Sequence, residues 1–205
     1  MFPTMRNTDT RVRLLAEAVR LIEEHGEAGV KVDLVCAAAG VARPSIYHFF
    51  GDREGLVIAA LGERYRQDLD ETIDVVYTLA QTVPDREQFV ELVHRSIRSF
   101  GDDDGVRRRR ERIQVMGSAV SRPQLQDEVR RVDDLAAGRL AALIDLGKER
   151  GWIGGAHASI DLARWWVGLM NGRHLVDIRD DEARAAWDRI TLDAIDRLLF
   201  GILPD

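Results

Sequence analysis

Hydrophobic residues recur at spacings of three and four along most of the chain, which is the periodicity of amphipathic α-helices. The first stripe predicts a helix from Thr10 to His25. Two short helices are predicted next, from Asp33 to Ala39 and from Arg43 to Phe49. Gly40 lies between them, where a left-handed turn favours glycine. The first fifty residues are therefore expected to form a three-helix head.

A long helix is predicted from Arg53 to about Ala80, and Asp52 stands where a side chain can cap its first turn. Past Pro84 five more helices are expected, over about 85–100, 106–120, 123–149, 158–178 and 181–200. Turn-rich segments such as "GDDDG" and "GWIGG" separate them. No convincing β-strand alternation occurs. We therefore predict an all-α fold of about nine helices, in which the long helix joins the three-helix head to a larger helical body.

The composition is that of a globular protein with a full core. Of the 205 residues, 45% are hydrophobic, and no stretch approaches the roughly 18 to 20 apolar residues of a membrane span. The first residues lack the apolar core of a secretion signal. Cys36 is the only cysteine, which excludes an intrachain disulfide, and we expect it to be a small buried residue. These features predict no membrane partner and a location in the cytoplasm.

The charge distribution limits how the chain can bind nucleic acid. The net charge is −6, yet residues 1–56 carry seven basic and eight acidic side chains, a balance of only −1. This region has no basic patch, so affinity for nucleic acid would rest on a few placed cations. The basic run "VRRRRER" at 106–112 follows "GDDD", and we interpret it as a solvated helix face rather than a second nucleic-acid site.

Residues 31–50 follow the order helix, tight turn, helix. Small residues in "CAAAGVA" allow two helices to cross closely, as in a helix-turn-helix whose second helix enters the DNA major groove. A seven-residue helix cannot bury four aromatic rings. We therefore expect Phe49 and Phe50 to pack inward, while Tyr47 and His48 face solvent.

The segment "AAAGVARPSIYHFFGDREGL", residues 37–56, resembles the signature of the TetR family of one-component bacterial regulators. The shared features are the alanine-rich helix, Ala-Gly-Val, a Tyr-x-x-Phe register and a basic-acidic pair before Leu. The resemblance covers residues 9–69, with the motif proper at 31–50. It implies a helix-turn-helix DNA-binding domain over 9–69 and an effector-binding and dimerisation domain over 70–205.

Two positions depart from the family pattern. Ala42 stands where Ser or Thr usually caps the recognition helix, and the lost cap is worth about 1 kcal/mol. Lys31 stands where Thr is common. A lysine there can reach a phosphate, although its charge opposes the dipole at a helix N-terminus. These departures affect the fine positioning of the head rather than its fold.

The resemblance implies that the partner is a double-stranded DNA operator. It places Tyr47, His48 and Arg53 against phosphate oxygens. Such contacts set the register of a protein on DNA without reading its sequence. The plain alternatives are that Tyr47 is a core aromatic with its hydroxyl at the surface and that His48 is simply solvated.

The resemblance also places Arg43, Pro44 and Ser45 nearest the base edges. An arginine can bind guanine through two hydrogen bonds, which discriminates against other bases by about 1–3 kcal/mol. The alternative for Arg43 is an ordinary surface arginine.

Two apolar stripes near the C-terminus exceed what one helical body needs. The resemblance implies that the last two long helices pair with those of a second chain in a four-helix interface. A two-fold homodimer also suits a palindromic operator with two half-sites. The expected interface residues are Val167, Gly168, Gly172, Trp187, Ile190, Ala194 and Leu198.

The remaining body helices are expected to enclose a pocket for a small-molecule effector. A lining of Met and Trp would favour an apolar or aromatic ligand. Plain core packing is the alternative role for each candidate. The candidates are His94, Phe100, Met116, Leu143, Trp166 and Met170.

The leading hypothesis is a ligand-responsive transcriptional regulator of the bacterial nucleoid, acting as a repressor that an effector releases from its operator. An enzyme is disfavoured, because the five histidines show no metal-ligand spacing and no phosphate loop or nucleophile motif occurs. We expect no cofactor and no metal site. A third possibility is a helical dimer that has lost DNA binding and acts through protein partners, which the intact Tyr47 and Arg53 disfavour.

Overall fold

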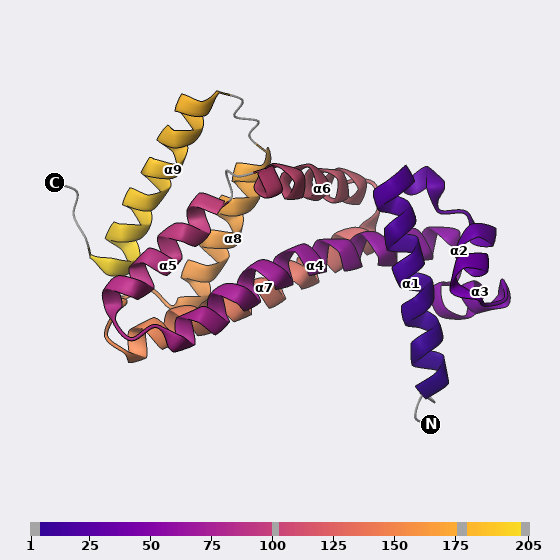
Figure 1. The fold of residues 1–205 in the computed structure, drawn as a ribbon, viewed down its shortest axis with the longest axis horizontal. Helices are drawn as coiled ribbons and strands as arrows, with labels where there is room; N and C mark the ends of the chain where they lie inside the picture. Colours follow the sequence, from indigo (N-terminus) through magenta and orange to yellow (C-terminus); the bar gives the residue numbers. More distant parts are fainter. Residues whose placement is uncertain (1–4, 100–102, 176–179, 202–205) are drawn as a thin grey trace. The chain divides into compact units, whose positions relative to one another are not determined.

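The computed structural model describes residues 5–99, 103–175 and 180–201 (Figure 1). Nine α-helices and no strand occur in this part of the chain, so the predicted all-α fold class is confirmed. Their bounds are α1 Met5–His25, α2 Val32–Ala39, α3 Pro44–Phe50, α4 Arg53–Thr82, α5 Arg86–Arg98, α6 Asp103–Ala119, α7 Pro123–Glu149, α8 Ser159–Leu175 and α9 Asp181–Ile195.

Most predicted helix ends agree with the structure because local signals set them. Gly40 has φ +65° and ends α2, and the amide of Val41 donates to the carbonyl of Cys36 at 3.0 Å. Asp52 accepts a hydrogen bond from the amide of Gly55 at 2.8 Å and so caps α4. Two features are absent from the sequence pattern. A 3-10 turn (η1) spans Glu27–Gly29, and a π-helical turn, Asp196–Phe200, follows α9.

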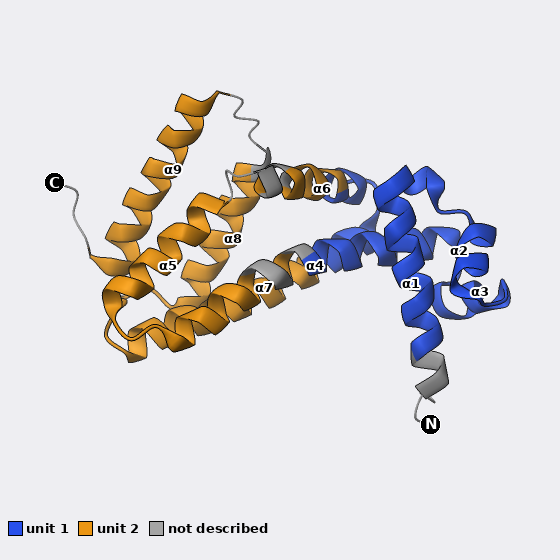
Figure 2. Cartoon of the chain, viewed as in Figure 1, with its two compact units in different colours: residues 1–67, 115–129 blue, residues 68–114, 130–205 orange. Residues whose placement is uncertain are grey.

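The chain divides into two compact units, which Figure 2 shows in different colours. The N-terminal unit holds residues 1–67 and 115–129, and the C-terminal unit holds residues 68–114 and 130–205. The first break lies close to the predicted domain boundary at 69. The segment 115–129, which the sequence pattern placed in the body, belongs to the N-terminal unit instead. As a consequence α4, α6 and α7 each run through both units.

The N-terminal unit is built on helix stripes with three- and four-residue spacing. Such spacing places side chains on one face, where they leave water together. Arg13 of α1 adds a polar tie, since its Nη1 donates to the carbonyl of Ala39 at 3.0 Å. The buried set includes Leu14, Ala18, Ile22, Val30, Val35, Ile46, Leu56, Ala60 and Leu61.

Arg122, at the start of α7, holds the segment 115–129 on the N-terminal helices. Its guanidinium lies 2.7 Å from a carboxylate oxygen of Glu27 and 2.7 Å from one of Glu54. The hydroxyl of Ser118 donates to Glu27 at 2.6 Å. The hydrogen bond from Arg122 is the largest cause that lowers the pKa of Glu27. Leu125, in the same segment, is fully buried. Polar and apolar contacts therefore hold this segment in place together.

Close helix packing in this unit also depends on one glycine. A Cβ added to Gly62 of α4 would lie 2.4 Å from Cγ of Glu128 in α7. Any larger residue would therefore displace the Glu128 side chain. Gly62 allows the two helices to approach at this point.

The C-terminal unit has its own apolar core, which α4, α5, α7, α8 and α9 supply. Phe89 is at its centre, with its ring 5.4 Å from that of Trp152 and 6.2 Å from that of Phe200. Arg86 donates to the carbonyl of Phe200 at 2.6 Å and so fixes the π-helical turn against α5. Fully or almost fully buried members include Ala80, Leu92, Ile97, Ala137, Ala163 and Ile195.

We predict that Arg122→Met lowers the free energy of unfolding of the protein by about 1–2 kcal/mol at pH 7, because two partly buried carboxylates lose their cation. The pKa of Glu27 is lower in the folded protein than its ordinary value of 4.5. The stability that the Glu27 ion pair contributes is therefore complete above pH 4.5, and it is lost as the pH falls through the pKa of the folded state. Denaturant titrations from pH 7 to pH 3 should therefore show a shallower acid loss in the variant than in the wild type.

Arg20→Met is the matched control, because Arg20 pairs with Glu17 and Glu24 on the exposed face of α1. It should change stability little. An acid profile of Arg122→Met that follows the wild type would contradict the proposed role of the Arg122 ion pairs.

Candidate nucleic-acid interface and apolar cavity

Helices α2 and α3 form the helix-turn-helix that the sequence predicts. Gly40 makes the left-handed turn, and Pro44 occupies the first turn of α3, where its missing amide hydrogen costs nothing. The N-cap residue of α3 is Arg43 rather than the expected Ala42, and its side chain makes no capping hydrogen bond. Ile46 is fully buried and fixes which face of α3 points inward.

The outward face of α3 carries polar and amphipathic side chains. Tyr47 is 56% exposed, and His48 is exposed beside it. Phe49 and Phe50 are half-buried. The ring of Phe49 meets His48 edge-on at 4.7 Å, and the guanidinium of Arg11 lies 5.5 Å from the ring of Phe50. The four neighbouring rings thus divide between the unit's interior and its surface, as the length of α3 requires.

Arg43 and Pro44, at the start of α3, are exposed, and Ser45 is half-buried. Nε of Arg43 lies 2.8 Å from a carboxylate oxygen of Asp33 in α2. Both side chains are mostly exposed, so the pair is weak and solvent-screened. A phosphate or base that engages Arg43 must displace or share this carboxylate. The sequence did not reveal the pair, because ten residues and a turn separate its members.

Arg53 has a structural role that the sequence did not show. Its Nε donates to the carbonyl of Val30 at 2.7 Å, and its Nη2 donates to the carbonyl of Glu27 at 2.6 Å. It therefore ties the start of α4 to the turn before α2. Nη1 takes no part in these two bonds and remains a donor for another partner. Lys31 is exposed immediately before α2 and makes no capping bond.

Cys36, on the inner side of α2, behaves as a packing residue. It is buried, and this burial is the main cause that raises the pKa of its thiol, with Asp33 adding to the effect. A raised pKa keeps the sulfur protonated and unreactive.

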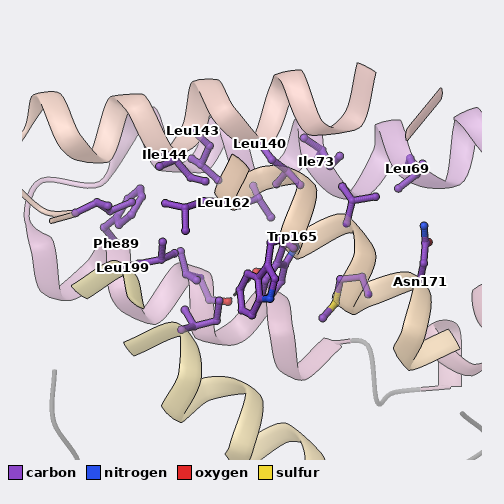
Figure 3. Close-up of a pocket in the computed structure, with 18 of the residues that line it drawn as sticks. Leu69, Ile73, Phe89, Leu140, Leu143, Ile144, Leu162, Trp165, Asn171 and Leu199 are labelled. Atoms are coloured by element: carbon purple, nitrogen blue, oxygen red, sulfur yellow. Dashed lines mark hydrogen bonds between the residues drawn. The ribbon is translucent and has the colours of Figure 1, made fainter. Parts of the chain in front are cut away.

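The C-terminal unit contains an apolar cavity of about 110 Å³, drawn in Figure 3. Residues of α4, α5, α6, α7, α8 and α9 line it, together with Ile153 and Leu199. Three of the expected pocket residues, Leu143, Trp166 and Met170, line this cavity. Trp165, Asn171 and Arg112 line it as well, although the sequence pattern gave no reason to choose them.

Two of the other three expected pocket residues, His94 and Met116, are placed elsewhere by the structure. Nε2 of His94 is 2.6 Å from a carboxylate oxygen of Asp196, so this histidine joins α5 to the π-helical turn. Met116 belongs to the N-terminal unit, and Phe100 lies outside the described residues. Helical periodicity could not separate these residues from true lining residues, because it shows that a side chain faces inward but not which interior it faces.

Helices α8 and α9 present an apolar face to solvent. Ile190 of α9 is 68% exposed, and Leu198, in the π-helical turn that follows α9, is also exposed. Ala194 is half-buried, and Trp187 lies under the guanidinium of Arg173 at 5.8 Å. Thr191 and Ile195 of α9 are buried, as is Leu199 of the π-helical turn.

On α8, a Cβ added to Gly168 or Gly172 would have no atom from other described parts of the chain within 4 Å. Open space at these two glycines is compatible with close approach of another helix. Val167, expected at the same interface, instead lines the cavity and is half-buried.

No three His, Cys, Asp or Glu side chains in the described ranges lie close enough together to hold a metal ion. No helix within those ranges combines the length and the apolar character that crossing a membrane would require.

Comparison with known proteins agrees with the helix-turn-helix. Residues 14–60 match the family model of bacterial regulatory proteins of the tetR family. No curated protein matches the chain.

Solved structures share the fold of almost the whole chain. A TetR-family transcriptional regulator from Mesorhizobium loti MAFF303099 is 17% identical, with a TM-score of 0.69 over 96% of this chain and 100% of that one. A TetR-family regulator from a Rhodococcus species is 22% identical, with a TM-score of 0.65 over 94% of this chain and 99% of that one. A transcriptional regulator from Saccharomonospora viridis, solved in complex with choline, is 17% identical, with a TM-score of 0.60 over 94% of this chain and 98% of that one.

We predict that two neighbouring substitutions on α3 differ strongly in their effect on stability. Ile46→Ala removes a fully buried side chain and should lower the free energy of unfolding by about 2–5 kcal/mol. Tyr47→Phe removes only an exposed hydroxyl and should unfold at the wild-type denaturant concentration. Equal losses in the two variants would show that the orientation of α3 described above is wrong.

Proposed function

We propose that this chain, whose residues 14–60 identify it as a member of the TetR family of bacterial regulatory proteins, is a repressor that a small-molecule effector releases from a palindromic DNA operator. The observation that carries the proposal is the helix-turn-helix, in which α3 buries Ile46 and exposes Arg43, Tyr47 and His48 together. A helix with one anchored face and one exposed polar face is suited to the major groove. No catalytic role is proposed.

Phosphate contacts would come from Tyr47, His48, Lys31 and the unused Nη1 of Arg53. These groups are few, which agrees with the near-neutral charge of residues 1–56. Binding would then depend on placement rather than on a general positive field, and the dependence on salt would be moderate. Arg43, Pro44 and Ser45, at the start of α3, would face the base edges.

Effector release would use the continuity of the helices. The cavity is lined by Leu69, Ile73 and Val76 of α4 and by Arg112 of α6. The same two helices continue into the N-terminal unit, where Ser118 of α6 binds Glu27. An α-helix is stiff along its axis, so a ligand that shifts α4 or α6 in the cavity also acts on the N-terminal unit. A coupling of about 1–3 kcal/mol would change DNA affinity roughly 5- to 150-fold.

The exposed apolar face of α8 and α9 supports a homodimer. A second copy of the chain would cover Ile190 and Leu198, and its own α3 would occupy the second half-site of a palindrome.

The proposal is tested by fluorescence anisotropy with DNA taken from upstream of the chain's own gene. The wild type should bind one segment of this DNA specifically. Tyr47→Phe should weaken that binding while the fold is unchanged, because one phosphate hydrogen bond is lost. A wild type with no DNA affinity would favour a dimer that acts through protein partners. If Tyr47→Phe binds as tightly as the wild type at matched salt, the phosphate role of Tyr47 is wrong.

Arg43 and Arg53 should differ in what they contribute. Arg43→Ala should relax the preference at one base pair of each half-site, with a loss of about 1–3 kcal/mol there. Arg53→Ala should weaken binding to all sequences alike and reduce the salt slope by about one per half-site. The measurement is the affinity for a set of single-base operator variants at two salt concentrations.

Arg53→Lys separates the charge of Arg53 from its hydrogen bonds to the carbonyls of Val30 and Glu27, because the lysine keeps the positive charge. If Arg53→Lys keeps the salt slope while Arg53→Ala loses it, the charge contacts a phosphate. If Arg43→Ala lowers the affinity for every operator variant equally and leaves the ranking of the operators intact, Arg43 positions the helix and reads no base.

The dimer gives a separate prediction. Light scattering at micromolar concentration should give twice the 23.1 kDa mass of the chain. Ile190→Arg should shift the protein toward the monomer, because a charge would enter an apolar interface. Val120→Arg is the control, since Val120 is 85% exposed and lies outside α8 and α9. A wild type that is monomeric throughout would contradict the dimer.

A further inference from the structure

The cavity of the C-terminal unit is elongated, and its two ends differ. Figure 3 shows Phe89 and Leu199 at one end, and Leu69 and Asn171 at the other. Along α8 the lining runs from Leu162 to Asn171. Nine residues of α-helix span about 13 Å. The cavity therefore suits a molecule that is longer than it is wide.

The volume limits the size of such a molecule. The cavity measures about 110 Å³. This volume is below the roughly 300–1,000 Å³ of pockets that take drug-sized ligands, so the bound molecule is small. Side chains on every side are mainly apolar, including both Trp165 and Trp166. Most of the bound molecule must therefore be hydrocarbon.

Polar groups are few, and one of them lacks a partner. Oδ1 of Asn171 is buried and has no hydrogen-bond partner among the residues that the structure describes. A buried amide atom without a partner costs about 1–3 kcal/mol, and a ligand can recover that energy. Rotation of the amide exchanges its oxygen and nitrogen, so Asn171 can present N–H groups to an acceptor.

The charge of the cavity lining indicates which polar head group a ligand carries. Arg112 is only 5% exposed and is the one charged side chain among the described lining residues. No carboxylate occurs among those residues, so the described lining itself offers a cationic ligand no countercharge. The guanidinium has five N–H donors, which allows it to bind an anion while it keeps a protein partner. Hydrogen bonds between arginine and carboxylate are among the stronger ones in proteins.

We propose that the cavity binds a small apolar monocarboxylate, whose hydrocarbon body lies among Phe89, Leu162 and the two tryptophans. Its carboxylate accepts hydrogen bonds from Arg112 and from the amide of Asn171. The proposal rests on the proposed function only in naming the effector class, because binding in the cavity can be measured without DNA. It also separates this chain from the choline-bound Saccharomonospora regulator, since choline is a cation.

The test compares ligands that share a body and differ in the head group. Tryptophan fluorescence or calorimetry at pH 7 is used to titrate the full-length wild type with octanoate, octan-1-ol and octylamine. Octanoate should bind at least about 10-fold more tightly than the alcohol, which lacks the charge, and the amine should bind most weakly. Phenylacetate and 2-phenylethanol form a second pair that tests a flat aromatic body. A preference for the acid in either pair supports the proposal, and no preference in both pairs overturns it.

Two variants locate the head group. Arg112→Met should raise the Kd of the preferred acid about 10- to 100-fold and leave the Kd of its alcohol almost unchanged. A merely structural role of Arg112 would weaken both ligands alike. Arg110→Met is the matched control, because Arg110 is exposed on the same helix and does not line the cavity. If Arg112→Met does not fold, Asn171→Leu gives a second measurement, with the same selective loss expected.

The outcomes distinguish this inference from the proposed function. If the acid binds but leaves DNA affinity unchanged, the monocarboxylate inference is supported and the proposed release of DNA by an effector is wrong. If an alcohol or amine binds more tightly than its acid and releases DNA, the inferred ligand class is wrong and the proposed regulatory function is supported.

Discussion

Three helices, α4, α6 and α7, each belong to both compact units, and this continuity is the constraint on which the rest of the structure depends. Neither unit has a complete core without them. Residues 115–129, from the end of α6 and the start of α7, pack on the N-terminal helices through Leu125 and the ion pairs of Arg122. Arg112 of α6 and the later parts of α4 and α7 supply part of the cavity wall. A substitution in these helices can therefore affect both units at once.

The N-terminal unit shows how a nearly neutral surface can still present a binding face. Its arginines are not free cations spread over the surface. Arg43 is paired with Asp33, and Arg53 donates to two carbonyls of the turn before α2. Arg53 is thus held in position before any partner arrives, whereas the exposed ion pair restrains Arg43 only weakly. Ordered side chains lose less conformational entropy on binding, so a few contacts suffice where mobile ones would not.

Side chains that share a cavity come from distant parts of the sequence, which explains the uneven outcome for the predicted pocket. Leu143, Trp166 and Met170 line the cavity, whereas His94 binds Asp196 and Met116 packs in the other unit. Each of the five residues lies on a helix with an apolar stripe. The stripe reports that a residue turns away from solvent. Which helices face each other across the interior depends on long-range packing, and no local spacing encodes it.

The sequence by itself determined the helices, their ends and the helix-turn-helix. These features follow from interactions within a few residues: apolar spacing, the left-handed turn at Gly40, the Asp52 cap and the burial of Ile46 opposite Tyr47. Only the tertiary structure decided that residues 115–129 join the N-terminal unit, that Arg53 binds backbone carbonyls, and that Arg112 and Asn171 line one cavity. These pairings join residues that are tens of positions apart in the chain. Their energy arises only when the helices have packed, and so it leaves no periodic signal in the sequence.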